Sequence, residues 1–110
     1  MATAYKILGQ SAPANTSNAD LYTVPASTST IVSTIAITNT TATVANATVY
    51  IRKAAATAAT GNAFVYTQAV PAYSTVTYTN GITLATTDVV TIATATANAL
   101  TFQAFGSELS

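Results

Sequence analysis

The chain contains no cysteine, no histidine and no tryptophan. Without histidine and cysteine it cannot form a Ser-His-Asp triad or a Cys-His pair, and it lacks the side chains that hold most zinc ions. Without cysteine it also has no disulfide framework, so the sequence does not indicate a redox compartment. We therefore expect no cofactor and no metal site, and we expect that the protein is not an enzyme.

Charge is also scarce. Six of the 110 residues are charged, three of each sign, whereas about a quarter of the residues are charged in an ordinary domain. Charge keeps proteins solvated and apart, so a surface of hydroxyls, methyls and amides suits close packing against other proteins. The balanced charge gives no reason to expect nucleic acid or an anionic membrane as a partner. No segment has the pattern of a signal peptide or a membrane span, so we expect synthesis in the cytoplasm.

Threonine and alanine are in excess, with 24 of each. β-Branched residues such as threonine, valine and isoleucine fit a pleated surface. Alanine and threonine bury little area each, so we expect one folded domain with a thin core. A thin core is often supplemented by a partner, which favours oligomerisation.

Period-2 alternation predicts strands. In residues 31–38, Ile31, Ile35 and Ile37 share one face, as expected for a half-buried strand. Turn signals recur about every ten residues and predict an all-β fold: a single antiparallel β-sandwich of seven or eight short strands, jelly-roll or immunoglobulin-like. The predicted strands are 4–9, 20–24, 30–38, 43–53, 63–69, 73–79, 82–92 (in one piece or two) and 98–105. Residues 1–19 would hold an N-terminal arm and the first strand, and residues 20–110 the sandwich.

Two segments carry local signals. Asn80-Gly81 stands between Tyr78 and Ile82, and because both turn residues tolerate positive φ, it predicts a tight hairpin. The alanine-rich residues 53–60 favour a helix by composition, but they are too few for a stable isolated helix. We therefore predict a loop there.

The three carboxylates, Asp20, Asp88 and Glu108, lie far apart in the sequence. Asp20 and Asp88 each stand before a predicted strand and are predicted to accept backbone N–H bonds in turns. Glu108 is expected to be exposed near the chain end. Catalysis by paired carboxylates needs two of them side by side, which this spacing does not suggest.

Four residues are candidates for contacts with other proteins. Tyr5 and Tyr73 begin predicted strands near loops, and tyrosine is enriched at interfaces because it combines an apolar face with a polar tip. Arg52 and Lys53 form the one local concentration of charge. They would either contact an acidic partner or form a solvated strand end.

Several segments are similar to a group of small virion proteins of tailed bacteriophages. They are residues 5–10 (YKILGQ), 21–26 (LYTVPA), 31–35 (IVSTI), 81–84 (GITL), 87–90 (TDVV) and 105–108 (FGSE). The resemblance extends over nearly the whole chain, but its motifs are structural and carry no catalytic signature. It implies a β-sandwich in the virion that contacts the major capsid protein or another virion protein.

The leading hypothesis is a non-enzymatic structural protein of a bacteriophage virion, made in the host cytoplasm. It would be a capsid decoration (cement) protein that stabilises the head by bridging capsomers as a homo-oligomer, with a trimer as the expected state. The alternative within the virion is a small neck, tail or fibre component that acts as an adaptor or host-binding module. A cellular adhesin or carbohydrate-binding sandwich is a third possibility, and the missing tryptophan and secretion signal count against it.

Overall fold

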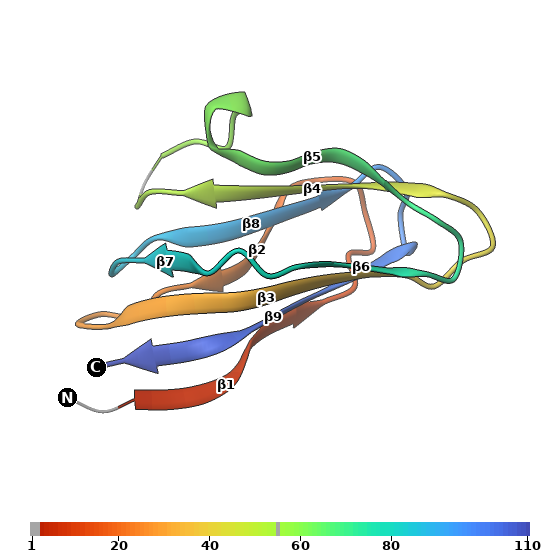
Figure 1. Ribbon diagram of the computed structural model, residues 1–110. Coiled ribbons are helices and arrows are strands. Elements are labelled where there is room, and N and C mark those ends of the chain that lie inside the picture. The colour runs from red at the N-terminus through yellow and green to blue at the C-terminus, as the bar shows by residue number, and fades with distance from the viewer. Residues whose placement is uncertain (1–2, 55) are drawn as a thin grey trace.

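The computed structural model describes residues 3–54 and 56–110, and two antiparallel sheets pack face to face as a sandwich (Figure 1). The predicted all-β sandwich is confirmed. The parts of the predictions that fall on residues 1, 2 and 55 lie outside the described residues. The sandwich measures 45 × 27 × 22 Å, and the start of β1 and the end of β9 lie at the same end of it (Figure 1).

Nine strands form the two sheets. Sheet A holds β1 (Thr3–Ser11), β9 (Leu100–Leu109), β3 (Ser29–Asn39), β6 (Thr75–Tyr78) and β7 (Ile82–Leu84). Sheet B holds β2 (Ala19–Thr23), β8 (Val89–Thr94), β4 (Ala45–Arg52) and β5 (Ala63–Val70). Irregular backbone follows β4, as predicted for the alanine-rich segment, and a short 3-10 turn (Thr60–Asn62) leads into β5.

The strand order is that of a jelly roll. Sheet A has the order β1-β9-β3-β6, with β7 also paired to β3, and sheet B has the order β2-β8-β4-β5. Because β6 and β7 both pair with β3, they are two pieces of one interrupted edge strand, and the sandwich has the eight strands of a jelly roll. The sequence left a jelly-roll and an immunoglobulin-like topology open, and this strand order is that of the jelly roll. The predicted strand 82–92 is two strands, β7 and β8, because the turn at Ala85–Asp88 carries the chain from one sheet to the other.

The core between the sheets is thin, as the composition predicts. It consists mainly of valine, isoleucine and alanine, and Phe102 is the one aromatic side chain among the described residues with no exposed area. Each buried isoleucine or valine contributes about 1.5–3 kcal/mol to folding. The largest fully buried apolar side chains are Phe102, Ile35, Ile37, Ile92, Leu100, Val24, Val32, Val49, Val70 and Val90.

A β-bulge in β3 changes which side chains face the core. The register with β9 shifts at Ser33, so the inward-facing residues change from Thr30 and Val32 before the bulge to Ile35 and Ile37 after it. Ile31 consequently points out of the sandwich and is 41% exposed. The predicted alignment of Ile31 with the other two isoleucines on one face is therefore wrong, because a bulge shifts the alternation by one residue.

The bulge brings the backbones of β3 and β9 unusually close together. A Cβ atom on Gly106 would lie 2.0 Å from the carbonyl oxygen of Ile31, a distance at which the backbone must move. A glycine at this position is therefore required by the close approach of two strands rather than by a turn.

The predicted hairpin at Asn80-Gly81 is wrong. Tyr78 at the end of β6 pairs with Ile35, and Ile82 at the start of β7 pairs with Val32, so the chain continues in one direction along the edge of β3. A type I′ turn needs positive φ at both central residues. Here Gly81 alone has it, at +67°, and the segment forms a kink beside the bulge.

Asn39 fixes the loops at the other end of the sandwich. Its side chain is 1% exposed, and its amide nitrogen donates to the carbonyl oxygens of Thr43 (2.8 Å) and Val70 (2.9 Å). Its amide oxygen accepts from the backbone N–H (2.9 Å) and the hydroxyl (2.7 Å) of Thr41. One buried amide therefore joins the β3–β4 loop to the end of β5.

We predict that Gly106→Ala lowers the free energy of unfolding by about 2 kcal/mol or more, because the added methyl overlaps the Ile31 carbonyl. Gly61→Ala is the matched control, since no atom lies within 4 Å of the added methyl there. Urea unfolding of the two variants compares them directly. Equal midpoints would contradict the close approach of β3 and β9.

We predict that Asn39→Asp lowers the free energy of unfolding by about 3 kcal/mol, because the carbonyls of Thr43 and buried Val70 lose their donor and a charge is buried. Asn46→Asp makes the same chemical change at an exposed position of β4 and should be nearly neutral. Thermal melts of both variants test this, and a neutral Asn39→Asp would show that the amide does not hold the loops.

Candidate interaction surface

Apolar side chains gather on the outer face of sheet A, at the end where β1 begins. Tyr5, Ile7 and Ile31 are 84%, 54% and 41% exposed. In the strand register, Tyr5 and Ile31 both pair with Ser107, so the two side chains share a face, and Ile7 pairs with Phe105 in the neighbouring row. We call Tyr5, Ile7, Ile31, Phe105 and Leu109 the outer-face patch.

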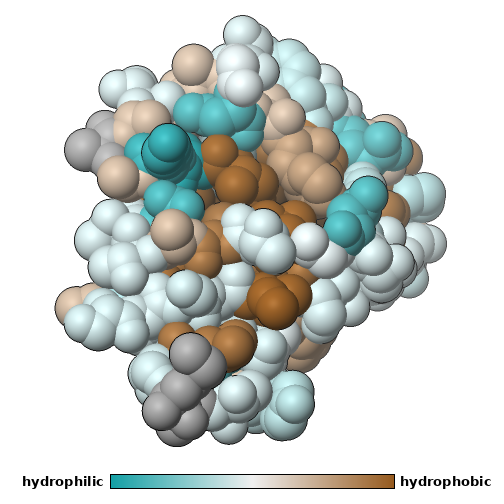
Figure 2. Space-filling model, turned by 60° about the vertical axis from the view of Figure 1, so that its left-hand side comes forward, coloured by the Kyte–Doolittle hydropathy of each residue, from teal (hydrophilic) through white to brown (hydrophobic). Residues whose placement is uncertain are grey.

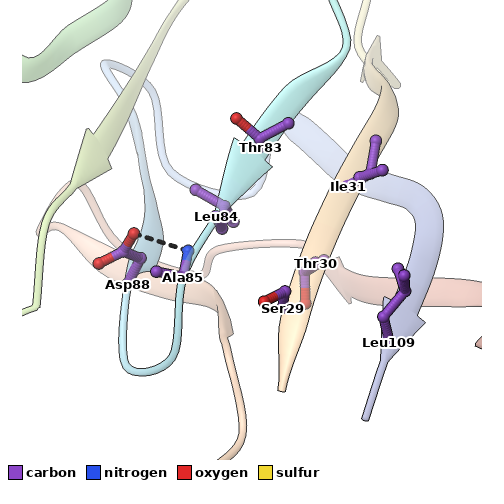
Figure 3. A pocket seen from close by; sticks show the side chains of 8 residues that line it. All are labelled: Ser29, Thr30, Ile31, Thr83, Leu84, Ala85, Asp88 and Leu109. Carbon is purple, nitrogen blue, oxygen red and sulfur yellow. Dashed lines mark hydrogen bonds between the residues drawn. The ribbon is translucent and has the colours of Figure 1, made fainter. Parts of the chain in front are cut away.

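Two open hollows flank Ile31. One, of about 430 Å³, lies between β3, β7 and the end of β9 and is lined by Ser29, Thr30, Ile31, Thr83, Leu84, Ala85, Asp88 and Leu109 (Figure 3). The other, of about 350 Å³, is lined by Tyr5, Lys6, Ile31, Ser33, Phe105, Gly106 and Ser107. Figure 2 shows hydrophobic side chains gathered in the middle of this end of the molecule, among weakly polar side chains and a few strongly hydrophilic ones. The hollows are shallow and suit a protein surface better than an enclosed small molecule.

The inner side of the same strands carries a polar network. Lys6 Nζ lies 2.6 Å from Glu108 Oε1, and the other carboxylate oxygen accepts a hydrogen bond from the hydroxyl of Tyr22 in sheet B. The Tyr22 hydroxyl also lies 2.8 Å from the Thr30 hydroxyl, which is buried. The network therefore joins β1, β9 and β3 of sheet A to β2 of sheet B.

The prediction that Glu108 is exposed is wrong, since its side chain is only 13% exposed. Its position follows from the register, because Glu108 pairs with Thr30 on the inward-facing side of β9. The hydrogen bond from Lys6, and then that from Tyr22, hold the pKa of Glu108 below its usual value. Burial, and then the hydrogen bond to Glu108, raise the pKa of Tyr22 to about 12.

The network should make stability depend on pH at both extremes. Because the folded-state pKa of Glu108 is lowered, its contribution is present above about pH 4.5 and is lost as the pH falls through the folded value. Because the folded-state pKa of Tyr22 is raised, its contribution is present below about pH 10 and is lost as the pH rises toward 12. Urea unfolding at pH 3, 7 and 11.5 should show both losses.

Glu108→Gln should flatten the acid side of this profile, and Tyr22→Phe the alkaline side. If either variant keeps the pH dependence of the wild-type protein, the corresponding group does not cause it.

Arg52 is occupied within its own chain. Its guanidinium donates to the hydroxyl of Thr91 (2.8 Å), to the carbonyl of Ala56 (2.8 Å) and to Asp20 Oδ1 (3.2 Å). Asp20 also accepts a hydrogen bond from Thr91, so it joins β2 to β8 and β4 and is not the predicted turn acceptor. Lys53 is exposed. The contact with an acidic partner suggested for Arg52 and Lys53 stays a prediction. Of the two side chains, Lys53 is the one whose exposed position would allow it.

Asp88 is a turn residue, as predicted. Its carboxylate accepts the backbone N–H groups of Ala85 (2.9 Å) and Ala54 (3.0 Å). It closes the β7–β8 turn at the rim of the first hollow (Figure 3) and ties that turn to the loop after β4.

The two candidate tyrosines lie at opposite ends of the sandwich. Tyr5 is next to the start of β3, whereas Tyr73, which is 73% exposed, bonds through its backbone N–H to Thr41 just beyond the end of β3. At about 3.3 Å per residue these places are roughly 30 Å apart. The structure does not bring Tyr5 and Tyr73 together, and their role as contacts stays a prediction.

Sequence reasoning found Tyr5 but missed the rest of the outer-face patch. The exposure of Ile7 could have been predicted, because Tyr5 and Ile7 alternate with Lys6 and so share a face. The outward direction of Ile31 and Phe105 could not have been predicted from the sequence, because it depends on the bulge opposite Gly106.

No metal centre is formed within residues 3–54 and 56–110, where no three His, Cys, Asp or Glu side chains come together. Within the same residues, no helix has the length and apolar character needed to cross a membrane.

No protein-family model and no curated protein sequence matches the chain. Among solved structures, a chain of infectious bursal disease virus, Gx strain, is similar, with a TM-score of 0.51 and 14% sequence identity. The match covers 97% of this chain and 31% of that chain, so this chain spans about a third of its length. At this identity the similarity concerns the fold alone: nearly all of the sandwich has a counterpart in a chain of a virus.

Proposed function

We propose that the chain is a non-enzymatic structural protein of a virion, and more specifically a decoration protein that bridges capsomers on a bacteriophage head. The outer-face patch carries the proposal. Three apolar side chains, Tyr5, Ile7 and Ile31, stand exposed, and none of the five residues of the patch is charged. Exposed apolar surface of this kind marks protein contacts. The resemblance to small phage virion proteins and the similarity in fold to a viral chain support the same role.

The pairing of charges supports the proposal further. Lys6 pairs with Glu108 and Arg52 with Asp20, so four of the six charges are engaged within the chain. A surface with so few free charges makes few repulsive contacts when many copies lie close together on a particle. Contact through such a surface depends on packing and is little affected by salt.

Quantitative mass spectrometry of purified virions tests the location. We expect hundreds of copies per particle, as bridging between capsomers requires. A few to a few dozen copies would instead support the neck, tail or fibre alternative. Absence from the particles would contradict any virion role.

Re-binding of purified protein to particles that lack it tests the contact surface. Ile31→Lys should lower particle occupancy about tenfold or more, because it places a charge between the two hollows. Val44→Lys, at an apolar position of similar exposure in the β3–β4 loop, is the matched control and should bind normally. Equal occupancy for both variants would exclude the outer-face patch as the contact.

The salt dependence of the same binding distinguishes the two candidate surfaces. We expect occupancy to change less than twofold between about 0.1 M and 1 M salt, a range over which the screening length falls from about 10 Å to 3 Å. A steep loss of binding, together with weaker binding by Lys53→Glu, would instead support contact between Lys53 and an acidic partner.

A further inference from the structure

The edge of sheet A formed by β1 is free to bind another strand. β1 pairs with β9 on one side, and the part of the chain that the structure describes places no strand on its other side. Alternate N–H and C=O groups of an edge strand point away from its neighbour and lack partners. No backbone hydrogen bond from the described loops reaches residues 3–11 either.

The first half of β1, before the register shift between Ile7 and Gly9, is also the most regular edge of the sandwich. Its first five residues, Thr3 to Ile7, keep unbroken register with β9, and all five are exposed. At the opposite edge of the same sheet, β6 and β7 are separated by the kink at Gly81. In sheet B, β2 has five residues with a register shift among them, and β5 has two shifts and a positive φ at Thr67. Interruptions of this kind prevent further strand pairing, and the first half of β1 has none.

The one charge on β1 does not protect this edge. A lysine on an edge strand normally prevents pairing by bringing charge to the incoming strand. Lys6 instead points to the inner side and pairs with Glu108 of its own chain at 2.6 Å. Tyr5 and Ile7, the neighbours of Lys6 on β1, have exposed side chains on the outer face and offer apolar surface to a strand added beside them.

From these observations we propose that β1 pairs antiparallel with β1 of a second copy of this chain, about a two-fold axis perpendicular to sheet A. The added strand is a second copy of β1 because an antiparallel edge is complementary to itself. In each copy Lys6 is neutralised by Glu108, so two such edges meet without net repulsion. A charged strand from another protein would find no opposite charge on this edge. Lys6 opposite Lys6 is the disfavoured register. Registers centred on Tyr5 or Ile7 place apolar side chains of the two copies side by side.

The pairing would join the outer-face patches of the two copies into one surface facing the virion. Its biological role therefore rests on the proposed function. The pairing itself is a property of the isolated protein. It is therefore tested in solution, where the result does not depend on particle binding.

Size-exclusion chromatography with light scattering at about 0.1 mM protein is the first test. We expect a mass twice the chain mass of 11.1 kDa. The double variant Tyr5→Lys/Ile7→Lys should run as a monomer, because it sets lysines against each other across the two-fold axis. Tyr66→Lys, at an exposed tyrosine on the edge strand of sheet B, should remain a dimer. A monomeric wild-type protein, a mass three times that of the chain, or a dimeric double variant would each overturn the proposal.

Cysteine cross-linking locates the interface even if the double variant does not fold. Because the chain has no cysteine, Tyr5→Cys and Ile7→Cys each introduce a single thiol. With a short bis-maleimide, we expect the variant whose thiol lies on the two-fold axis, Tyr5→Cys or Ile7→Cys, to give a cross-linked dimer within minutes and Tyr66→Cys to give at least tenfold less. Equal yields from all three variants, or none from the β1 variants, would exclude pairing through β1.

Discussion

The close contact between Gly106 and the backbone of Ile31 determines the rest of the surface. Because a side chain at position 106 would collide with a carbonyl 2.0 Å away, the strands β3 and β9 can meet at a bulge only if this residue is glycine. The bulge then reverses the alternation of β3, so Val32 and Ile35 both face the core while Ile31 faces out. Without it, the outer face of sheet A would lose the residue that separates its two hollows.

A second constraint is the small number of charges, four of which are paired within the chain. Lys6 with Glu108 closes one end of the sandwich through Tyr22, and Arg52 with Asp20 joins three strands of sheet B. An exposed ion pair contributes about 0–1 kcal/mol, so these pairs matter less for stability than for the charge that they neutralise at the surface. Apart from Lys53 and the half-exposed side chains of Lys6 and Asp20, the outside of the protein carries mainly hydroxyls, methyls and a few tyrosines.

The alternating pattern and turn residues predicted the sandwich and most of its strands, because period-2 alternation reflects burial on one face. They did not predict where alternation breaks. The direction of Ile31, the kink at Gly81 and the burial of Glu108 all depend on how β3 meets its neighbours, and these neighbours are about 40 to 80 residues away in the sequence. Arg52 likewise appeared as a free charge because Asp20 is 32 residues away. The wrong predictions therefore come from strand register between distant segments, which local sequence propensity does not reveal.

The kink at Gly81 has a consequence for what the sandwich can grow into. A sheet with two regular edges can add copies at both sides and extend without limit as a fibril. Here one edge of sheet A is broken between β6 and β7, and both edges of sheet B are irregular. The proposed association through the remaining edge would be self-limiting, because each added chain uses the edge through which it joins. A protein rich in threonine, valine and isoleucine, a composition prone to amyloid, would in this way be kept to closed assemblies.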